Sequence, residues 1–252
     1  MNARFKFVIL VLLTLLLAAS LALNYYLFDR GLQYYMQLNG TRLDPLGLNF
    51  YPTSANQRDL TDPNRTTVVF FGDSRAANWP APIGFDEIEF INRGLGAQTS
   101  TQVTQRFEYH LNPLQPQIII LQVGINDLKT IPLFPDQNER IVANCKANIQ
   151  QIVAQSVASG VTVILTTIFP VGGVPFERKP LWSDDVAESV DEVNAYLRTL
   201  AAEKVIIFDA YSILADDDGR MKAEYSEDEL HINGRGYEAL NNELAAILSV
   251  WD

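Results

Sequence analysis

Short apolar runs alternate with helix-like patterns over most of the chain. The runs are rich in β-branched and aromatic residues and are bounded by turn residues, as buried parallel strands are. Between them, apolar residues recur every three or four positions, which is typical of amphipathic helices. The predicted strands cover Thr67–Phe71, Ile88–Ile91, Gln117–Val123, Val161–Leu165 and Val205–Phe208. The predicted helices cover Thr101–His110, Asn138–Ser159, Asp184–Ala202 and Gly236–Val250.

This order of elements predicts the fold class. Strands that alternate with helices, without long hairpin signals, favour a parallel sheet with helices on both faces. We therefore expect an α/β protein with a central parallel sheet between two helical layers.

The first residues of the chain have a different pattern, without a polar face. Arg4 and Lys6 precede an apolar stretch from Phe7 to Leu23, which only Thr14 and Ser20 interrupt. Such a stretch is at the short limit for a membrane-spanning helix. Basic residues ahead of it predict that the N-terminus stays in the cytoplasm and that the rest of the chain is exported.

Two interpretations of this N-terminal segment remain open. Ser20-Leu21-Ala22 resembles a signal-peptide cleavage site, which predicts a secreted or periplasmic protein. Tyr25 and Tyr26 follow directly, and tyrosines favour the membrane interface, which supports an uncleaved anchor. We favour the anchor. The expected organisation is an anchor or signal segment over 1–28, a short helical stalk and linker over 29–65, and a folded domain over 66–252.

Composition excludes several classes of function. The net charge of -11 argues against nucleic acid as a partner, since phosphate binding needs clustered basic residues. Cys145 is the only cysteine, so we expect neither an internal disulfide nor a thiolate metal cluster. His, Asp and Glu residues show no metal-ligand spacing, and no metal or cofactor is expected.

Candidate chemistry appears where the first predicted strand ends, at Gly72-Asp73-Ser74. A serine just past the carboxyl end of a strand lies where open α/β sheets bind ligands. Far downstream, Asp228 and His231 stand three residues apart. A serine hydroxyl needs a base to accept its proton, histidine suits that task, and a carboxylate orients the imidazole. We predict Ser74 as nucleophile, His231 as general base and Asp228 as its orienting group, with His110 structural.

Together with Gly124-Ile125-Asn126-Asp127, these motifs resemble the SGNH (GDSL-type) hydrolase family of serine esterases and acyl-transfer enzymes. The resemblance runs from about residue 66 to the C-terminus, with the motifs in the family's order. It implies a flavodoxin-like three-layer sandwich.

The same resemblance implies an oxyanion hole. Its donors would be the backbone N–H groups of Ser74 and Ala97 and the side-chain amide of Asn126, while Asp127 holds the loop. Ala97 departs from the family, which typically has glycine at this position, and Gly96 is the alternative donor one residue earlier.

The segment from Ile168 to Trp182 is a long loop in which Phe169, Phe176 and Trp182 alternate with glycines and prolines. It forms either packed surface or a substrate wall, and both interpretations stay open. Trp182 and Phe176 are the candidate substrate contacts.

The predicted function is a serine esterase of the cell envelope that hydrolyses lipid acyl or acetyl esters. One alternative is an O-acyltransferase or deacetylase acting on envelope carbohydrate. The other is a membrane-anchored binding domain without catalysis. The expected partners are therefore a small-molecule, lipid or carbohydrate ester and, through the N-terminal helix, a membrane.

Overall fold

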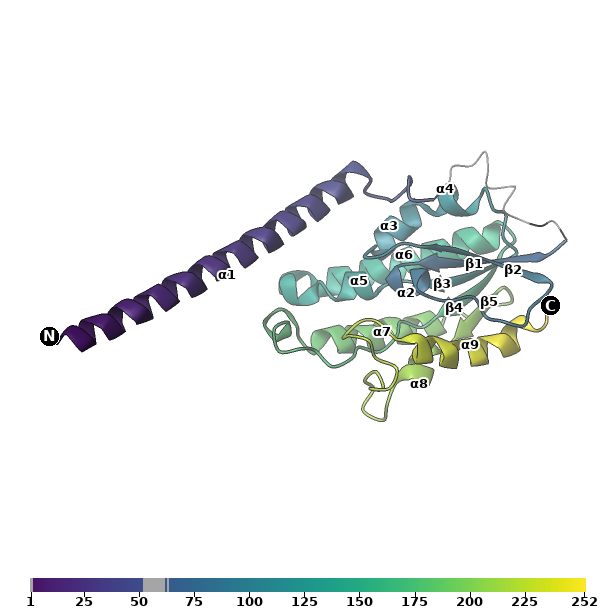
Figure 1. Cartoon of the computed structure of the whole chain (residues 1–252). Coiled ribbons are helices and arrows are strands. Elements are labelled where there is room, and N and C mark those ends of the chain that lie inside the picture. The colour runs from purple at the N-terminus through teal and green to yellow at the C-terminus, as the bar shows by residue number, and fades with distance from the viewer. Residues whose placement is uncertain (1, 52–61, 63) are drawn as a thin grey trace. The chain divides into compact units, whose positions relative to one another are not determined.

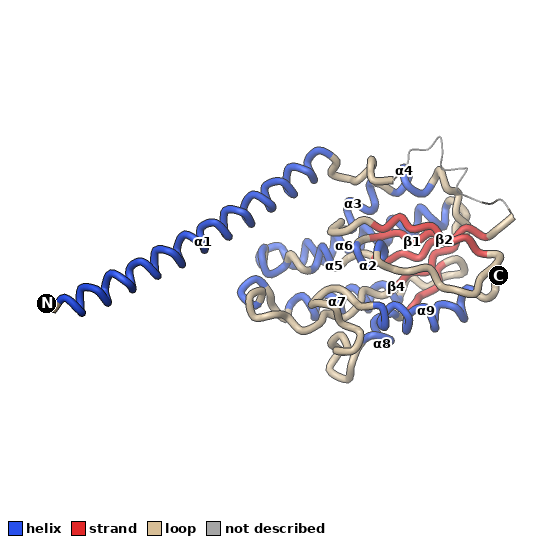
Figure 2. Tube along the Cα trace, viewed as in Figure 1, coloured by secondary structure: helices blue, strands red, loops and turns tan. Residues whose placement is uncertain are grey.

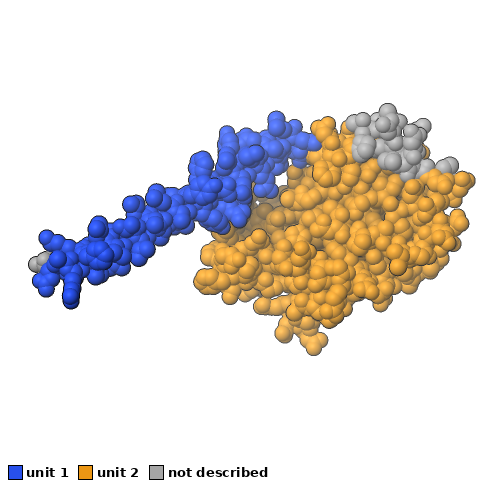
Figure 3. All heavy atoms as spheres, viewed as in Figure 1, with its two compact units in different colours: residues 1–45 blue, residues 46–252 orange. Residues whose placement is uncertain are grey.

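The computed structural model describes residues 2–51, 62 and 64–252, which form two compact units, Met1–Pro45 and Leu46–Asp252 (Figure 3). The first unit is one helix, α1 (Ala3–Leu43), in which no residue is buried. It is long and apolar enough to cross a membrane. The helix continues to Leu43, into the region 29–65 where a short helical stalk and then a linker were expected. Residues 52–61 and 63 of the expected linker lie outside the described residues.

The second unit contains a β-sheet, whose strands are red in Figure 2. The sheet has five strands in the order β2-β1-β3-β4-β5. Every pair of neighbouring strands is parallel, which confirms the predicted sheet. The strands are β1 (Thr66–Gly72), β2 (Ile88–Gly94), β3 (Ile118–Gln122), β4 (Thr162–Thr166) and β5 (Val205–Phe208).

Helices cover both faces of this sheet, as predicted (Figure 1). Alternate strand residues face opposite sides, so Val69 and Phe71 enter one buried cluster while Val68 and Phe70 enter the other. The first cluster includes residues of α3 (Ser100–Gln105), α4 (Phe107–Leu111), α5 (Ile125–Leu128), α6 (Asn138–Ala158) and α7 (Asp185–Arg198). The second includes residues of α8 (Ala210–Leu214) and α9 (Gly234–Leu248).

The helix predicted over Thr101–His110 is interrupted at Arg106. Helix α3 ends at Gln105 and α4 begins at Phe107, with Arg106 between them at φ -93° and ψ 3°. A short helix α2 (Ser74–Ala77) and the short α5 and α8 were not predicted, because four or five residues carry no readable periodicity. Short 3₁₀ helices span Ile131–Leu133, Pro135–Gln137 and Lys179–Leu181.

The strand order has the flavodoxin-like form, in which the chain leaves β1 toward one side and later returns to the other. Ligands of such sheets bind outside the carboxyl ends of the strands where the direction switches. Here that point lies between β1 and β3, and Gly72 at the end of β1 is level with Gly94 and Gln122. A side chain at position 72 would place its Cβ 1.7 Å from the carbonyl oxygen of Gln122, so the close approach requires glycine.

Candidate active site

Ser74 opens helix α2 immediately after β1. Asp73 is the N-cap, and its side chain accepts a hydrogen bond from the backbone N–H of Arg75 at 2.9 Å. The first N–H groups of a helix have no acceptor inside the helix, so the N–H of Ser74 can serve a ligand. The half-buried Ser74 thus presents both a hydroxyl and a backbone donor at the switch point of the sheet.

His231 and Asp228 meet Ser74 in a chain of hydrogen bonds. Ser74 Oγ lies 3.0 Å from His231 Nε2, and His231 Nδ1 lies 2.8 Å from Asp228 Oδ2. A carboxylate only accepts, so Nδ1 carries the proton and the lone pair of Nε2 faces the serine hydroxyl. The sequence-predicted trio therefore converges across 157 positions of the chain.

The Asp228 carboxylate is held on both oxygens. Its Oδ1 accepts the backbone N–H groups of Leu230 and His231, each at 2.7 Å. Partial burial acts to raise the pKa of Asp228, but the bonds from His231 and the two backbone groups outweigh it and lower the pKa. The carboxylate thus stays ionised at neutral pH, as an orienting group for an imidazole requires.

Asn126 and the Ala97 loop are joined directly. Asn126, in α5 beyond β3, is buried and donates its Nδ2 to the carbonyl of Gln98 at 3.0 Å. An amide nitrogen carries two hydrogens, so one remains to donate elsewhere. Ala97 is exposed, with φ +62°, and within the described residues its N–H has no acceptor. Two of the three predicted oxyanion donors, Ala97 and Asn126, therefore lie on directly bonded segments.

Asp127 fastens the same loop to the start of α3. Its carboxylate accepts the N–H of Ser100 at 2.8 Å and the Ser100 hydroxyl at 2.7 Å. Burial raises the pKa of Asp127, while the bonds from Ser100 lower it. These bonds tie α5 to the start of α3, and the loop-holding role of Asp127 stays a prediction.

Arg75 supports the candidate site through hydrogen bonds that were not predicted from the sequence. Its side chain is fully buried and donates Nε to the carbonyl of Leu230 at 2.8 Å and Nη1 to that of Phe169 at 3.1 Å. The residue after Ser74 is thereby bonded to the residue before His231. Burial lowers the pKa of Arg75 to about 10, so the guanidinium is still charged at neutral pH.

The aromatic residues of the loop after β4 differ in how deeply they are buried. Phe169 is fully buried in the core and lies 5.0 Å from the Arg75 guanidinium, so it belongs to the interior and not to a substrate wall. Trp182 packs partly buried against the core, whereas Phe176 is 85% exposed. Gly173 and Pro175 line a pocket of about 520 Å³ that also includes Asp228. The loop therefore lies beside Asp228 at residues 172–175.

Arg178 and Glu229 join this loop to the Asp228–His231 segment. Glu229 is buried and forms an ion pair with the more exposed Arg178. The N–H of Gly172 also donates to the carbonyl of Glu229 at 2.9 Å. Glu229 thus acts as a structural link beside the site.

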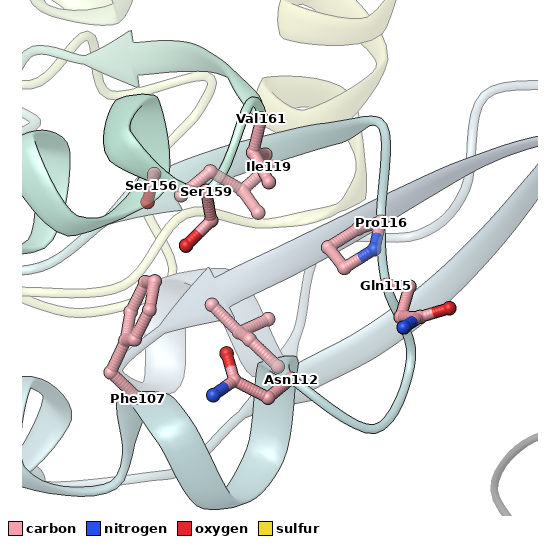
Figure 4. A pocket seen from close by; sticks show the side chains of 9 residues that line it. Phe107, Asn112, Gln115, Pro116, Ile119, Ser156, Ser159 and Val161 are labelled. Carbon is pink, nitrogen blue, oxygen red and sulfur yellow. The ribbon is translucent and has the colours of Figure 1, made fainter.

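A second pocket lies away from Ser74. It measures about 540 Å³ and is lined near the amino ends of β3 and β4 by residues that include Phe107, Ile119, Ser156 and Val161 (Figure 4). Ligands of open α/β sheets bind at the opposite, carboxyl ends of the strands.

The described residues contain no group of three His, Cys, Asp or Glu side chains that could hold a metal ion.

Known proteins share both the sequence pattern and the fold. The model of the GDSL-like lipase/acylhydrolase family matches residues 60–239. No curated protein sequence matches the chain.

Three solved structures illustrate the likeness in fold. A GDSL-like lipase from Bacteroides thetaiotaomicron has 20% identity and a TM-score of 0.64, covering 81% of this chain and 98% of its own. A lipase/acylhydrolase from Enterococcus faecalis has 21% identity and a TM-score of 0.56, covering 74% and 96%. A catalytic mutant of an acetylxylan esterase from Geobacillus stearothermophilus has 17% identity and a TM-score of 0.56, covering 72% and 93%. At these identities, the likeness extends to the fold alone.

The carboxyl of Asp73 gives a pH-dependent prediction. Burial raises its pKa to about 6, with Arg75 acting in the opposite direction. The folded protein therefore binds this proton more tightly than the unfolded chain, so the contribution of Asp73 to stability is lost as pH rises toward 6. Asp73→Asn keeps an acceptor for the Arg75 N–H without the charge. We expect its free energy of unfolding in urea to equal or exceed that of the wild type at pH 8, with the difference declining toward pH 4.

Asp209→Asn is the matched control. Burial acts to raise the pKa of Asp209, but hydrogen bonds from Arg198 and Ser212 lower it, so its stabilising contribution is present at neutral pH and is lost on acidification. This variant should be less stable than the wild type at pH 8. A loss of stability at pH 8 in Asp73→Asn as well would contradict the assignment of a penalised charge at position 73.

Proposed function

The chain belongs to the GDSL-like lipase/acylhydrolase family, and from that premise we propose that it hydrolyses carboxylic esters through Ser74, His231 and Asp228. The family model supports ester hydrolysis in general. The observation that carries the finer proposal is the continuous hydrogen-bonded chain from Ser74 Oγ through the His231 ring to Asp228.

The first half of the reaction acylates the serine. Ser74 Oγ attacks the carbonyl carbon while its proton passes to His231 Nε2, and Asp228 stabilises the imidazolium that forms. The carbonyl oxygen becomes an oxyanion, which the N–H groups of Ser74 and Ala97 and the amide of Asn126 would receive. When the tetrahedral intermediate collapses, His231 returns the proton to the leaving alcohol.

The second half repeats these steps with water. The oxygen of the water attacks the acyl carbon while His231 takes a proton from the same water. His231 then gives this proton to Ser74 Oγ as the carboxylic acid leaves. A hydroxyl group on a carbohydrate would enter at the same step in place of water, which is the acyl-transfer alternative. The chemistry of Ser74 is the same in both.

The proposal also covers the substrate and the location of the protein. We propose that the substrates are lipid acyl or acetyl esters of the cell envelope, that Trp182 and Phe176 contact the substrate, and that α1 is the membrane anchor. Trp182 is partly exposed and Phe176 is exposed, so both side chains are accessible to a ligand, and the length and apolar character of α1 support the anchor.

The triad is tested by three single substitutions assayed on ester panels of increasing acyl length. Ser74→Ala and His231→Ala should each remove nearly all turnover and leave the thermal unfolding midpoint within a few degrees of the wild type. Asp228→Asn should lower kcat by about 10⁴, because the amide favours the wrong imidazole tautomer. Turnover that survives His231→Ala but not His110→Ala would reassign the base. Labelling by an active-site serine probe would separate an enzyme from a binding domain.

The oxyanion donor at position 97 gives a second prediction. The backbone N–H does not depend on the side chain, and glycine adopts the observed positive φ without strain, so Ala97→Gly should keep kcat within about tenfold. Ala97→Pro removes the N–H and cannot adopt that φ, so it should cost at least as much as Asn126→Ala, about 10²–10³. Circular dichroism must show a folded protein. If Gly96→Pro is damaging while Ala97→Pro stays active, the donor is Gly96.

The proposed orientation of α1 in the membrane predicts the outcome of protease treatment of whole cells. Arg4 and Lys6 ahead of the apolar stretch favour a cytoplasmic N-terminus. External protease, applied after opening any outer envelope, should therefore digest the domain while a cytoplasmic marker survives. A mature N-terminus near residue 23, read by sequencing or mass spectrometry, would replace the anchor by a cleaved signal peptide.

A further inference from the structure

Gln98, the residue after Ala97, is bonded to three separate parts of the domain. Its side chain is only 6% exposed. Its backbone carbonyl accepts Asn126 Nδ2 at 3.0 Å, its side-chain Oε1 accepts Nε of Arg106, and its Nε2 donates to the carbonyl of Leu46 at 2.8 Å. One residue thus connects the Ala97 loop with the Asn126 loop, with α3 and α4, and with the start of the domain.

Arg106 extends this connection to the ends of two strands. The guanidinium is buried, and it donates to the carbonyls of Gly72 at 2.7 Å and Arg93 at 2.8 Å, besides Gln98. A fourth contact, 3.1 Å long, reaches Nδ1 of His110, which is itself buried. Burial lowers the pKa of Arg106 to about 9, so the group remains a cation at neutral pH. The planar guanidinium fork suits this task better than a lysine would.

The segment Leu46–Tyr51 contacts the loop from Gly94 to Gln98. Tyr51 donates its hydroxyl to the carbonyl of Gly94 at 2.6 Å, and its ring lies 4.5 Å from the Arg93 guanidinium. At Gly47, where φ is +67°, an added Cβ would come within 2.7 Å of Leu95 and 3.4 Å of Gln98 Nε2. The residues that follow α1 are therefore in direct contact with the loop from Gly94 to Gln98.

That loop needs such support because of its backbone. Ala97 has φ +62°, a left-handed conformation that is unfavourable for a residue with a side chain. Conformations of this kind persist where the surroundings determine them. The three bonds of Gln98 supply that constraint at the position next to the candidate donor.

We propose that Gln98 is a positioning residue for the oxyanion donors and that, through it, turnover depends on Leu46–Tyr51, the segment that joins α1 to the catalytic domain. The proposal rests on the function proposed above, in which the Ala97 N–H and the Asn126 amide receive the oxyanion. A misplacement of about 1 Å at such a group costs on the order of 10² in rate. Because the oxyanion exists only after attack, the effect should fall on kcat and leave KM nearly unchanged.

The first test compares Gln98→Leu and Gln98→Glu in the full-length protein in detergent. Leucine removes both side-chain bonds, and kcat should fall about 10- to 100-fold with KM within about threefold. Affinity for a trifluoromethyl ketone, which forms a tetrahedral adduct with the serine, should fall in parallel. Glutamate keeps the acceptor for Arg106 but loses the donor to Leu46, so its effect should be smaller.

The second test addresses the Leu46–Tyr51 segment, again in the full-length chain. Gly47→Ala forces a Cβ against Leu95 and Gln98, whereas Gly160→Ala has a similar positive φ and no atom within 4 Å of the added Cβ. The two variants share the backbone strain, so only Gly47→Ala should lower kcat. In the same way, Tyr51→Phe removes a bond to the carbonyl of Gly94, and Tyr211→Phe removes one to the carbonyl of Gly219. Only Tyr51→Phe should reduce turnover.

A double-mutant cycle distinguishes positioning from general stability. If Gln98 acts through the donors, the losses in kcat for Gln98→Leu and Asn126→Ala should not add, since each spoils the same hole. Additive losses, or wild-type kcat in Gln98→Leu and Gly47→Ala, would overturn the inference while leaving a Ser74-dependent esterase intact. Absence of ester hydrolysis in the wild-type protein would instead overturn the proposed function. Hydrogen exchange at the Leu95 amide, which donates to the carbonyl of Gly72 at 3.0 Å, gives a readout independent of activity, and protection unchanged by Gln98→Leu would also count against the inference.

Discussion

The level at which the central strands end determines the geometry of the site. Gly72 is paired with Gly94 on one side and with Gln122 on the other, so β1, β2 and β3 release their loops at one height. Parallel pairing makes this possible, because it brings the carboxyl ends of all strands to the same edge. Ser74, Ala97 and Asn126 each follow one of these endings within a few residues.

Buried arginines donate to backbone carbonyls at this edge and in the loops beyond it. Arg106 serves Gly72 and Arg93, and Arg75 serves Phe169 and Leu230. A buried charge is costly unless it is paired or well hydrogen-bonded, and here the acceptors are mostly carbonyls. The pKa values of both arginines fall below the ordinary value, yet both remain protonated at neutral pH. In this acidic protein, two buried arginine side chains thus connect backbone segments of the interior by hydrogen bonds.

Local patterns in the sequence were sufficient to predict the sheet, the long helices and the serine, histidine and aspartate residues that converge. Those features depend on runs of neighbouring residues, or on short motifs whose order is shared with a family. The roles of Arg75 and Gln98 could not be predicted, because their partners lie 155 and 52 positions away. Arg106 could have been noticed in the sequence, because it is a charged residue on the same helical face as Val103 and His110. In the structure its side chain is buried, and it lies at the break between α3 and α4. Residues 46–51 were assigned to a linker because nothing periodic marks them.

The hydrogen bond between Ser74 and His231 spans 157 positions of the chain. During synthesis at about 5–20 residues per second, the histidine is added roughly 8–30 s after the serine. Over that interval the nascent chain has Ser74 but neither His231 nor Asp228. A polypeptide that is interrupted during synthesis, or clipped before Asp228, therefore lacks the hydrogen-bonded chain that the proposed mechanism needs. The order of these residues in the sequence thus delays assembly of the candidate site until the segment before α9 has been made.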